Sequence, residues 1–240
     1  DFGHSQVFKA TTYTCLLFLQ RAKANSYEYG TSEASAKSLS GAAFAKRESK
    51  SLTARAWTFE SLETASLLTK LGNRTTRLLE LPADMSRGSS TGDDEIFVFE
   101  GGTLKVEKEI VREPLFASDF GRYRFSPAGK WKVIFPYVSE NGEFRLYTEQ
   151  ELKRLFPRAY AYLHENQQGL KRRKQFKDWF GYSAPRNLAL HDQAQIAVPL
   201  LADRGLFALI PSQTRGQLCP MASGGFTITL SKQCQLKAEY

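Results

Sequence analysis

The sequence predicts an α+β protein, with strands near both ends of the chain and helices between them. Two observations support this fold class. Short apolar, β-favouring runs bounded by turn-forming residues occur in both halves of the chain. Segments with helical spacing or helix-capping residues lie between these runs. The mixed order of the elements, with no internal repeat, favours an α+β domain preceded by a piece of another sheet.

The first elements are two predicted strands, residues 2–8 and 12–20, which a short loop can join into a hairpin. The second contains a continuous apolar run, residues 13–19, which is typical of a buried strand. Residues 22–51 are rich in Ala, Ser, Lys and Glu. They predict a linker or surface excursion, with a domain boundary near residues 45–55.

The middle of the chain begins with a predicted helix over residues 59–71, which has apolar residues at helical spacing and ends at Gly72. Predicted strands follow at residues 78–81, 96–99 and 131–137. The turn-forming segment Arg87-Gly88-Ser89-Ser90-Thr91-Gly92-Asp93 lies between the first two. Asn141-Gly142 predicts a tight hairpin turn.

Helix signals then dominate. Thr148-Glu149-Gln150-Glu151 matches a capping box, in which the threonine hydroxyl and the second glutamate satisfy free backbone N–H groups. Pro157 suits the first turn of a helix that ends near Asn166. A third helix is predicted over residues 169–180. Strands return at residues 195–201, 206–211 and 226–230.

Charge is unevenly distributed along the 240 residues, whose formal net charge is +8. Residues 1–120 contain 15 Lys/Arg and 16 Asp/Glu, whereas residues 121–240 contain 18 and 9, a net charge of +9. A basic face on one half of a chain is typical of a polyanion site. The alternative is a solvated helix surface that keeps the protein soluble.

Composition and motifs exclude several classes of protein. With 42% hydrophobic and 24% charged residues, wholesale disorder is excluded. Three widely spaced cysteines exclude a disulfide framework and favour a reducing cytosol. The longest apolar runs are too short to span a bilayer, and no signal peptide is visible. Because the first residue is Asp1 rather than Met, we expect a fragment of a longer protein.

Several catalytic signatures are absent from the sequence. It has no GxxxxGK[ST] loop, no GxSxG elbow and no HExxH pair. The three histidines, His4, His164 and His191, are far apart, so surface or capping roles are favoured over metal ligation. Glu48-Ser49-Lys50 and Glu151-Leu152-Lys153 have the ExK spacing of some nucleases, but Glu151 is already explained by its cap.

Seven short motifs in a fixed order resemble a known family. They are Asp1-Phe2-Gly3 … Val7-Phe8 … Thr12-Tyr13-Thr14-Cys15-Leu16-Leu17; Arg87-Gly88 … Thr91-Gly92-Asp93 … Phe97; Pro114-Leu115 … Ser118-Asp119-Phe120 … Arg122-Tyr123; Ile134-Phe135-Pro136-Tyr137; Phe156-Pro157-Arg158-Ala159-Tyr160-Ala161-Tyr162-Leu163 … Leu170 … Arg173; Trp179 with Arg186; and Gln195-Ile196-Ala197-Val198-Pro199. Together they resemble the C-terminal part of a type II (type IIG-like) restriction–modification adenine-N6 DNA methyltransferase with a TaqI-like C-terminal specificity domain.

The resemblance implies a domain layout and a division of labour. Residues 1–50 would be the end of the methyltransferase catalytic domain, its terminal β-hairpin and a linker, and residues 51–240 a mixed α/β target-recognition domain. The catalytic [DN]PP[YF] motif and the glycine-rich S-adenosylmethionine motif are missing. In the family both precede the hairpin. The resemblance therefore implies no catalytic residue, metal or cofactor in this fragment, and S-adenosylmethionine in a parent enzyme that can also carry an endonuclease.

The resemblance also supplies a candidate for base stacking. Methylation of adenine N6 requires the base to leave the duplex. In the family an aromatic residue of the terminal hairpin stacks on the flipped base, and its match here is Phe8. The alternative is that Phe8 is a core residue of the hairpin.

Candidate DNA-binding residues come from charge and loop position. The phosphate-contact candidates are Lys171, Arg172, Arg173, Lys174 and Lys177. The base-reading candidates are Arg87, Thr91 and Asp93. Arg122, Arg124 and Arg186 are further DNA-binding candidates with no particular contact assigned. The alternatives are a solvated helix near Glu165 and Asp178, an ordinary tight turn at residues 87–93, and an ion pair of Asp119 with Arg122 or Arg124. Trp131 and Trp179 are interpreted as core anchors.

The predicted function is sequence-specific recognition of double-stranded DNA, beside the upstream catalytic domain of the same chain, in the cytoplasm and without a membrane. Three alternatives stay open. A general nucleic-acid-binding module would bind all duplexes alike, with steep salt dependence. A nuclease would depend on a metal and on Glu151. A structural interaction domain would present its basic face to an acidic protein.

Overall fold

The structure is a computed structural model that describes residues 1–3, 5–9, 14–33, 35–52, 57, 59, 61–73, 75–125, 129–202 and 204–235. The chain forms two compact units, Asp1–Thr75 and Thr76–Tyr240, and each is described by itself. The described residues combine seven α-helices with antiparallel and mixed sheets, so the predicted α+β class is confirmed. The predicted join of two functional domains near residue 50 stays a prediction.

The described residues of the first unit form one small sheet and two helices. Strands β1 (Ser26–Tyr29) and β2 (Ala45–Glu48) pair antiparallel, with α1 (Ala36–Ser40) between them in the chain and a short 3₁₀ turn, Ser49–Ser51, after them. The predicted linker therefore carries a hairpin. Helix α2 (Leu62–Gly72) confirms the predicted helix, and the hydroxyl oxygen of Ser61 caps it by accepting from the Thr64 N–H at 3.1 Å.

The predicted N-terminal hairpin is wrong for the residues that the structure describes. Residues 14–20 form no strand, and the side chains of Leu17, Phe18 and Leu19 are 61%, 86% and 82% exposed. The Phe2 N–H donates to the Thr14 carbonyl oxygen at 3.2 Å, but no strand ladder follows. An apolar run becomes a buried strand when a sheet covers it, and no sheet of the described first unit does so. Residues 10–13 of the prediction lie outside the described residues.

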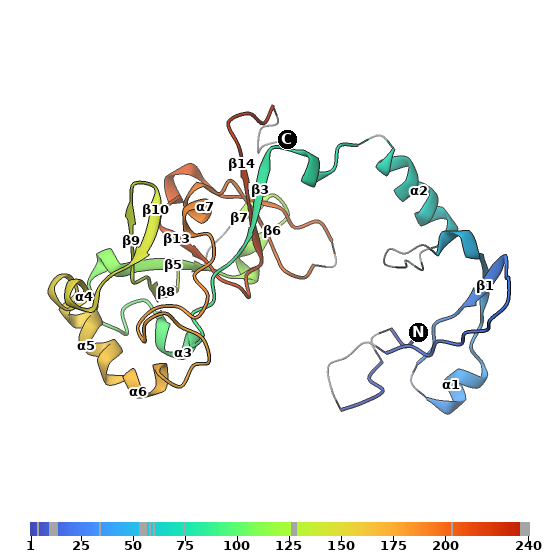
Figure 1. The fold of residues 1–240 in the computed structure, drawn as a ribbon, viewed down its shortest axis with the longest axis horizontal. Helices are drawn as coiled ribbons and strands as arrows, with labels where there is room; N and C mark the ends of the chain where they lie inside the picture. Colours follow the sequence, from blue (N-terminus) through green and yellow to red (C-terminus); the bar gives the residue numbers. More distant parts are fainter. Residues whose placement is uncertain are drawn as a thin grey trace. The chain divides into compact units, whose positions relative to one another are not determined.

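Two four-stranded sheets build the second unit. The antiparallel sheet has the order β12-β11-β14-β3, with bounds Ala208–Leu209, Ile196–Val198, Phe226–Leu230 and Ala83–Arg87. The mixed sheet has the order β13-β5-β8-β4, with bounds Leu218–Pro220, Val111–Leu115, Trp131–Ile134 and Val98–Glu100. Figure 1 shows β3 beside β14, the longest strand pair of this unit. The predicted strand over residues 226–230 is confirmed, and those over 195–201 and 206–211 are present but shorter.

Two hairpins complete the strands: β6 (Phe120–Gly121) with β7 (Arg124–Phe125), and β9 (Tyr137–Glu140) with β10 (Glu143–Leu146). At the β9–β10 turn, Asn141 and Gly142 have φ of 53° and 85°. Positive φ at both central residues is what the predicted tight turn requires, so that prediction is confirmed. The single predicted strand over residues 131–137 is divided between β8 and β9.

Five α-helices lie in the part of the second unit that the structure describes. Their bounds are α3 (Asp94–Phe97), α4 (Glu149–Leu155), α5 (Pro157–Glu165), α6 (Gln167–Leu170) and α7 (Leu188–Gln193). Short 3₁₀ turns occur at Leu78–Glu80, Lys108–Ile110, Ala117–Asp119 and Ser212–Thr214. The strand predicted over residues 78–81 is wrong, because a 3₁₀ turn occupies it. The strand predicted over 96–99 is half right, since α3 ends at Phe97 and β4 follows.

The main core of the second unit lies among the mixed sheet, the β9–β10 hairpin and α3 to α6. Leu152, Leu163 and Leu170 of three successive helices are fully buried there. Tyr182 is 1% exposed, and its hydroxyl donates to the Ile134 carbonyl oxygen at 2.7 Å. A smaller core cluster consists of Leu115, Phe120, Ala194, Ala197, Ala208, Ile210 and Leu218.

The two tryptophans predicted as core anchors behave differently. Trp179 is 7% exposed and packs in the main core, which confirms the prediction. Trp131 is 40% exposed, with the ammonium of Lys130 5.2 Å from its ring centroid. It lies at the first position of β8, where its side chain remains at the surface, so that prediction is wrong.

Candidate nucleic-acid interface

The densest run of positive charge lies just after α6 and not on a helix. The predicted helix over residues 169–180 ends at Leu170, where the backbone changes to i→i−3 hydrogen bonds: the Arg172 N–H donates to the Gly169 carbonyl oxygen at 2.9 Å. The Arg173 guanidinium donates to the Leu170 and Trp179 carbonyl oxygens, so a side chain supplies donors where a continued helix would supply backbone N–H groups. The prediction of a long helix is therefore wrong.

Four cations of this run have exposed side chains, and we refer to them as the basic segment: Lys171, Arg172, Lys174 and Lys177. The predicted alternative was a surface on which Glu165 and Asp178 balance this charge. No ion pair joins either carboxylate to the basic segment. The four charges are thus available to a phosphate backbone.

Arg173 differs from its neighbours because its guanidinium is directed into the protein. It donates to the carbonyl oxygens of Thr91 (2.6 Å), Gly181 (2.8 Å), Trp179 (2.5 Å) and Leu170 (2.9 Å). Partial burial lowers the pKa of this guanidinium from its usual value, against the raising effect of nearby Asp93. The side chain links three segments of the fold, so its charge is used internally.

The predicted recognition loop is largely buried. Ser89 and Thr91 have no exposed surface. The Ser90 N–H and carbonyl group exchange hydrogen bonds of 3.0 Å with those of Ala184, and the Ser89 N–H donates to the Pro220 carbonyl oxygen at 2.8 Å. The segment is therefore paired on both sides, unlike the ordinary tight turn that was the alternative.

Individual candidates of this segment fall into two groups. The Thr91 hydroxyl donates to Asp94 and accepts from the Asp93 N–H, while the Asp93 carboxylate caps α3 by accepting from the Ile96 N–H at 3.3 Å. Arg186 donates to the Gly88 carbonyl oxygen at 3.2 Å. These polar groups hold the segment in place. Arg87, at the end of β3, has an exposed side chain with no hydrogen bond or ion pair in the described part of the chain.

The β6–β7 hairpin presents Arg122 and Tyr123 at its turn, both exposed. The Asp119 carboxylate, 8% exposed, accepts from the Phe116 N–H at 2.8 Å, and no ion pair joins it to Arg122. The Arg122 guanidinium instead lies 5.3 Å from the ring centroid of Tyr123. The side chain of Arg124 lies outside what the structure describes.

Phe8, the candidate for base stacking, lies in the first unit and is 63% exposed. Its alternative interpretation, a core residue of a hairpin, is wrong because neither the burial nor the hairpin is present in the described residues. The ring is accessible, and the stacking role stays a prediction.

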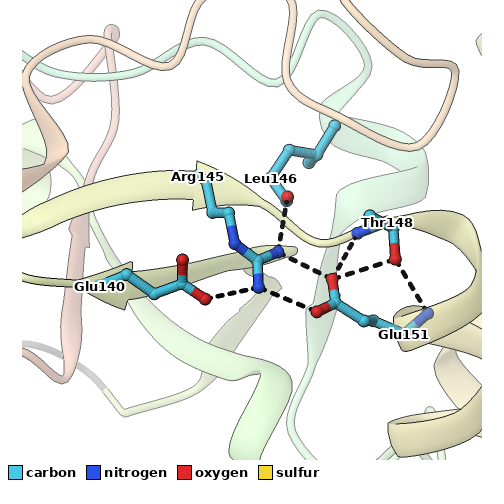
Figure 2. A network of polar contacts seen from close by, with 5 residues as sticks. All are labelled: Glu140, Arg145, Leu146, Thr148 and Glu151. Carbon is cyan, nitrogen blue, oxygen red and sulfur yellow. Dashed lines mark hydrogen bonds and ion pairs between the residues drawn. The ribbon is translucent and has the colours of Figure 1, made fainter.

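The ExK candidate at Glu151 belongs to a structural network. Figure 2 shows the Arg145 guanidinium between the carboxylates of Glu140 and Glu151. Glu151 accepts from Arg145 at 2.7 and 2.9 Å and from the Thr148 N–H at 2.8 Å, and the Thr148 hydroxyl oxygen accepts from the Glu151 N–H at 3.2 Å. The capping box is therefore confirmed. The Arg145 hydrogen bonds, followed by that of Thr148, lower the pKa of Glu151 to about 2.

The histidines that the structure describes are not gathered into a metal site. His164 lies beside Trp179, with ring centroids 6.1 Å apart, and His191 is buried in α7. His4 lies outside the described residues. No group of three or more His, Cys, Asp or Glu side chains in the described ranges is placed to hold a metal ion.

His191 makes the stability of the second unit sensitive to acid. Its Nε2 lies 3.1 Å from the Ser86 hydroxyl and 3.2 Å from the Arg87 carbonyl oxygen, while its buried Nδ1 has no hydrogen-bond partner in the described residues. Burial lowers the pKa of His191 from 6.5 to about 4, despite the hydrogen bond to Arg87. Protonation of Nδ1 would place a positively charged ring in a buried site. The new N–H would have no hydrogen-bond acceptor among the described residues.

Because this pKa is lowered, the unfolded chain binds the His191 proton at a higher pH than the folded chain does. We expect the free energy of unfolding to fall as the pH drops from about 6.5 to 4, by about 3 kcal/mol in total from this group. Urea denaturation of the wild type and His191→Gln across this range measures the difference. A wild type and a variant with parallel pH profiles would contradict the buried neutral histidine.

Scans of the sequence against protein-family models and against curated proteins found no match. In the described part of the chain, no helix has the length and apolar character needed to cross a membrane.

Tyr123 appears in the sequence only as part of a motif and not as a candidate site residue. Tyr123 is 74% exposed and has a φ of 59°. Gly121 signals a turn, but neither central residue of that turn, Arg122 or Tyr123, is the glycine or asparagine that would signal positive φ. Backbone geometry was therefore needed to find it.

Proposed function

We propose that the chain recognises specific sequences in double-stranded DNA, as the C-terminal specificity part of an S-adenosylmethionine-dependent adenine-N6 DNA methyltransferase of a restriction–modification system, in the cytoplasm. The basic segment carries the DNA-binding part of this proposal, because four exposed cations lie within seven consecutive residues and have no carboxylate partner among the described residues. The seven ordered sequence motifs support the narrower assignment to this enzyme class.

The basic segment contributes affinity in this proposal. Lys and Arg side chains that neutralise phosphates release condensed counterions, which strengthens binding to any sequence. Such contacts set the position and orientation of the protein on the duplex. Arg173 and Arg186 instead donate to backbone carbonyl oxygens of the fold.

Base reading falls to side chains whose polar atoms are accessible. Arg87 and Arg122 meet this condition, and a guanidinium can donate to O6 and N7 of guanine together. Thr91 and Asp93 act in the proposal by holding the backbone that precedes α3, since their oxygens take part in its cap. Arg124 stays a DNA-binding prediction.

The chemistry of methyl transfer belongs to the upstream catalytic domain in this proposal, and that domain would bind S-adenosylmethionine. Phe8 would stack on the flipped adenine, which offsets part of the free energy of unpairing. A second candidate function is a nucleic-acid-binding module without sequence choice. The basic segment favours this alternative, since phosphate contacts carry no sequence information.

Selection of the chain against a randomised duplex pool separates the two functions. Enrichment of one short motif, followed by discrimination that persists when the selected duplex is titrated at two salt concentrations, is the expected result. Binding without enrichment would favour the general module. Absence of binding at low salt would contradict both functions.

The salt dependence of binding locates the phosphate contacts. We expect the double variant Arg172→Ala/Lys174→Ala to reduce the slope of log affinity against log salt by about 2, since each phosphate contact contributes about 0.9. The matched control is Lys105→Ala/Lys108→Ala, which removes two exposed cations from the part of the chain that is not basic overall. The slopes are measured by fluorescence anisotropy. Equal slopes for the two double variants would show that the DNA does not contact the basic segment.

A further inference from the structure

Tyr123 occupies a backbone conformation that its residue type avoids. Among the described residues, three that are not glycine have positive φ: Tyr123 (59°), Asn141 (53°) and Asn187 (43°). Asparagine adopts this region readily, whereas a bulky side chain is unfavourable there because Cβ approaches the following carbonyl oxygen. The fold therefore holds this tyrosine against its backbone preference.

The backbone around Tyr123 is fixed by hydrogen bonds on both sides of the turn. The β6–β7 ladder pairs Phe120 with Phe125 and Gly121 with Arg124, and the Tyr123 N–H donates to the Phe207 carbonyl oxygen at 3.0 Å. These bonds tie the hairpin to the segment that leads into β12. The ring is thus presented from an ordered turn and not from a free loop.

The Tyr123 ring is not buried, so no packing offsets the unfavourable backbone conformation. Tyr123 is 74% exposed, which is the largest exposed fraction of any described tyrosine or tryptophan in the second unit. One contact is made by the Arg122 guanidinium, 5.3 Å from the ring centroid. Since strain without a packing benefit persists where function requires it, the geometry indicates an external ligand for the ring.

We infer that Tyr123 stacks on a DNA base that has lost its partner or its stacked neighbour. This inference rests on the proposed DNA recognition. Base flipping leaves such bases in the duplex, because the bases that flanked the flipped one each have an uncovered π-face. An aromatic ring stacks on any base, and an adjacent guanidinium adds attraction to the ring and to phosphate. Because the turn is held by hydrogen bonds before DNA binds, little backbone entropy is lost on stacking.

The role of Tyr123 differs from that proposed for Phe8. Phe8 lies in the first unit and is assigned to the flipped adenine by the family resemblance. Tyr123 lies in the second unit, and its assignment comes from the strained, exposed turn. We assign it to a base left within the helix, such as one that flanked the flipped adenine.

The test compares two duplexes: one fully paired and one with a single unpaired adenine at its centre. Fluorescence anisotropy gives the affinity of the full 240-residue chain for each, at one salt concentration. We expect the wild type to prefer the duplex with the unpaired base. Tyr123→Gly should bind this duplex about tenfold more weakly, which corresponds to about 1.4 kcal/mol of lost stacking, and Tyr123→Phe should bind as the wild type does.

Two controls separate stacking from a structural role. Glycine adopts a φ of 59° freely, so Tyr123→Gly should unfold at the wild-type temperature or above it. Trp131→Ala removes another exposed aromatic ring of this unit and should leave the preference between the two duplexes unchanged.

The outcomes distinguish this inference from the proposed function. If Tyr123→Gly keeps the wild-type preference while the wild type binds DNA, the stacking inference is overturned and DNA recognition stands. If the preference disappears in Tyr123→Gly while pool selection yields no enriched motif, stacking stands and sequence-specific reading fails. If the wild type binds neither duplex at low salt, both are overturned.

Discussion

Gly88→Ala should destabilise the second unit by about 4 kcal/mol, a large effect for a single added methyl group. A Cβ at this position would lie 2.2 Å from the Met221 carbonyl oxygen and 2.8 Å from that of Pro220. These are backbone atoms, and hydrogen bonds hold them: the Ser89 N–H donates to Pro220 at 2.8 Å, and the Ala222 N–H donates to Ser89 at 2.7 Å. Relief of the clash would break this pairing, in addition to the strain of overpacking.

The control for this substitution is Gly169→Ala in α6, where the nearest atom to a new Cβ is Ile96 Cδ1 at 3.7 Å. Alanine has a higher helix propensity than glycine, so this variant should be as stable as the wild type or up to about 1 kcal/mol more stable. Urea denaturation followed by tryptophan fluorescence reports on the second unit through Trp131 and Trp179. Equal midpoints for Gly88→Ala and the wild type would show that the two segments are not packed together.

Gly88 also shows that a sequence can indicate a close backbone approach without identifying the group that approaches. Gly88 and Gly92 lie in the predicted recognition loop, and glycine allows another group to approach the backbone closely. The approach is real at Gly88, but the backbone concerned is that of residues 220–221, more than a hundred positions later in the chain. Nothing in a local pattern identifies a contact at that separation.

Signals that act within a few residues are the ones that the structure confirms. The Thr148 capping box, the first-turn Pro157 and the Asn141-Gly142 turn each depend on backbone groups at most four residues away. Their geometry is therefore written in the local sequence. The α+β class follows from such local signals.

Predictions that depend on distant partners fail more often. Residues 14–20 are apolar enough for a buried strand, but no sheet in the described first unit covers them. The predicted helix over residues 169–180 ends early because the Arg173 guanidinium donates hydrogen bonds to the carbonyl oxygens of Thr91 and Gly181. Tertiary contacts override local propensity in such segments.

Arg173→Ala should lower the free energy of unfolding of the second unit by about 4 kcal/mol. The guanidinium donates to four backbone carbonyl oxygens and lies 5.4 Å from the ring centroids of Phe97 and Phe176. Hydrogen bonds from a charged donor contribute about 1.5 to 3 kcal/mol each, and the carbonyl groups left behind in a half-buried site regain water incompletely. Arg173→Lys should recover part of this loss, because one ammonium cannot reach all four acceptors.

Arg172→Ala is the matched control, since the two arginines are adjacent and indistinguishable by charge. The Arg172 side chain is exposed, so its removal should change stability by less than about 0.5 kcal/mol. It should instead reduce the salt dependence of DNA binding by about one phosphate contact. Paired urea denaturation and DNA titration of both variants should therefore give opposite patterns. A stable Arg173→Ala that has lost DNA affinity would mean that its guanidinium faces the nucleic acid and not the carbonyl groups of the fold.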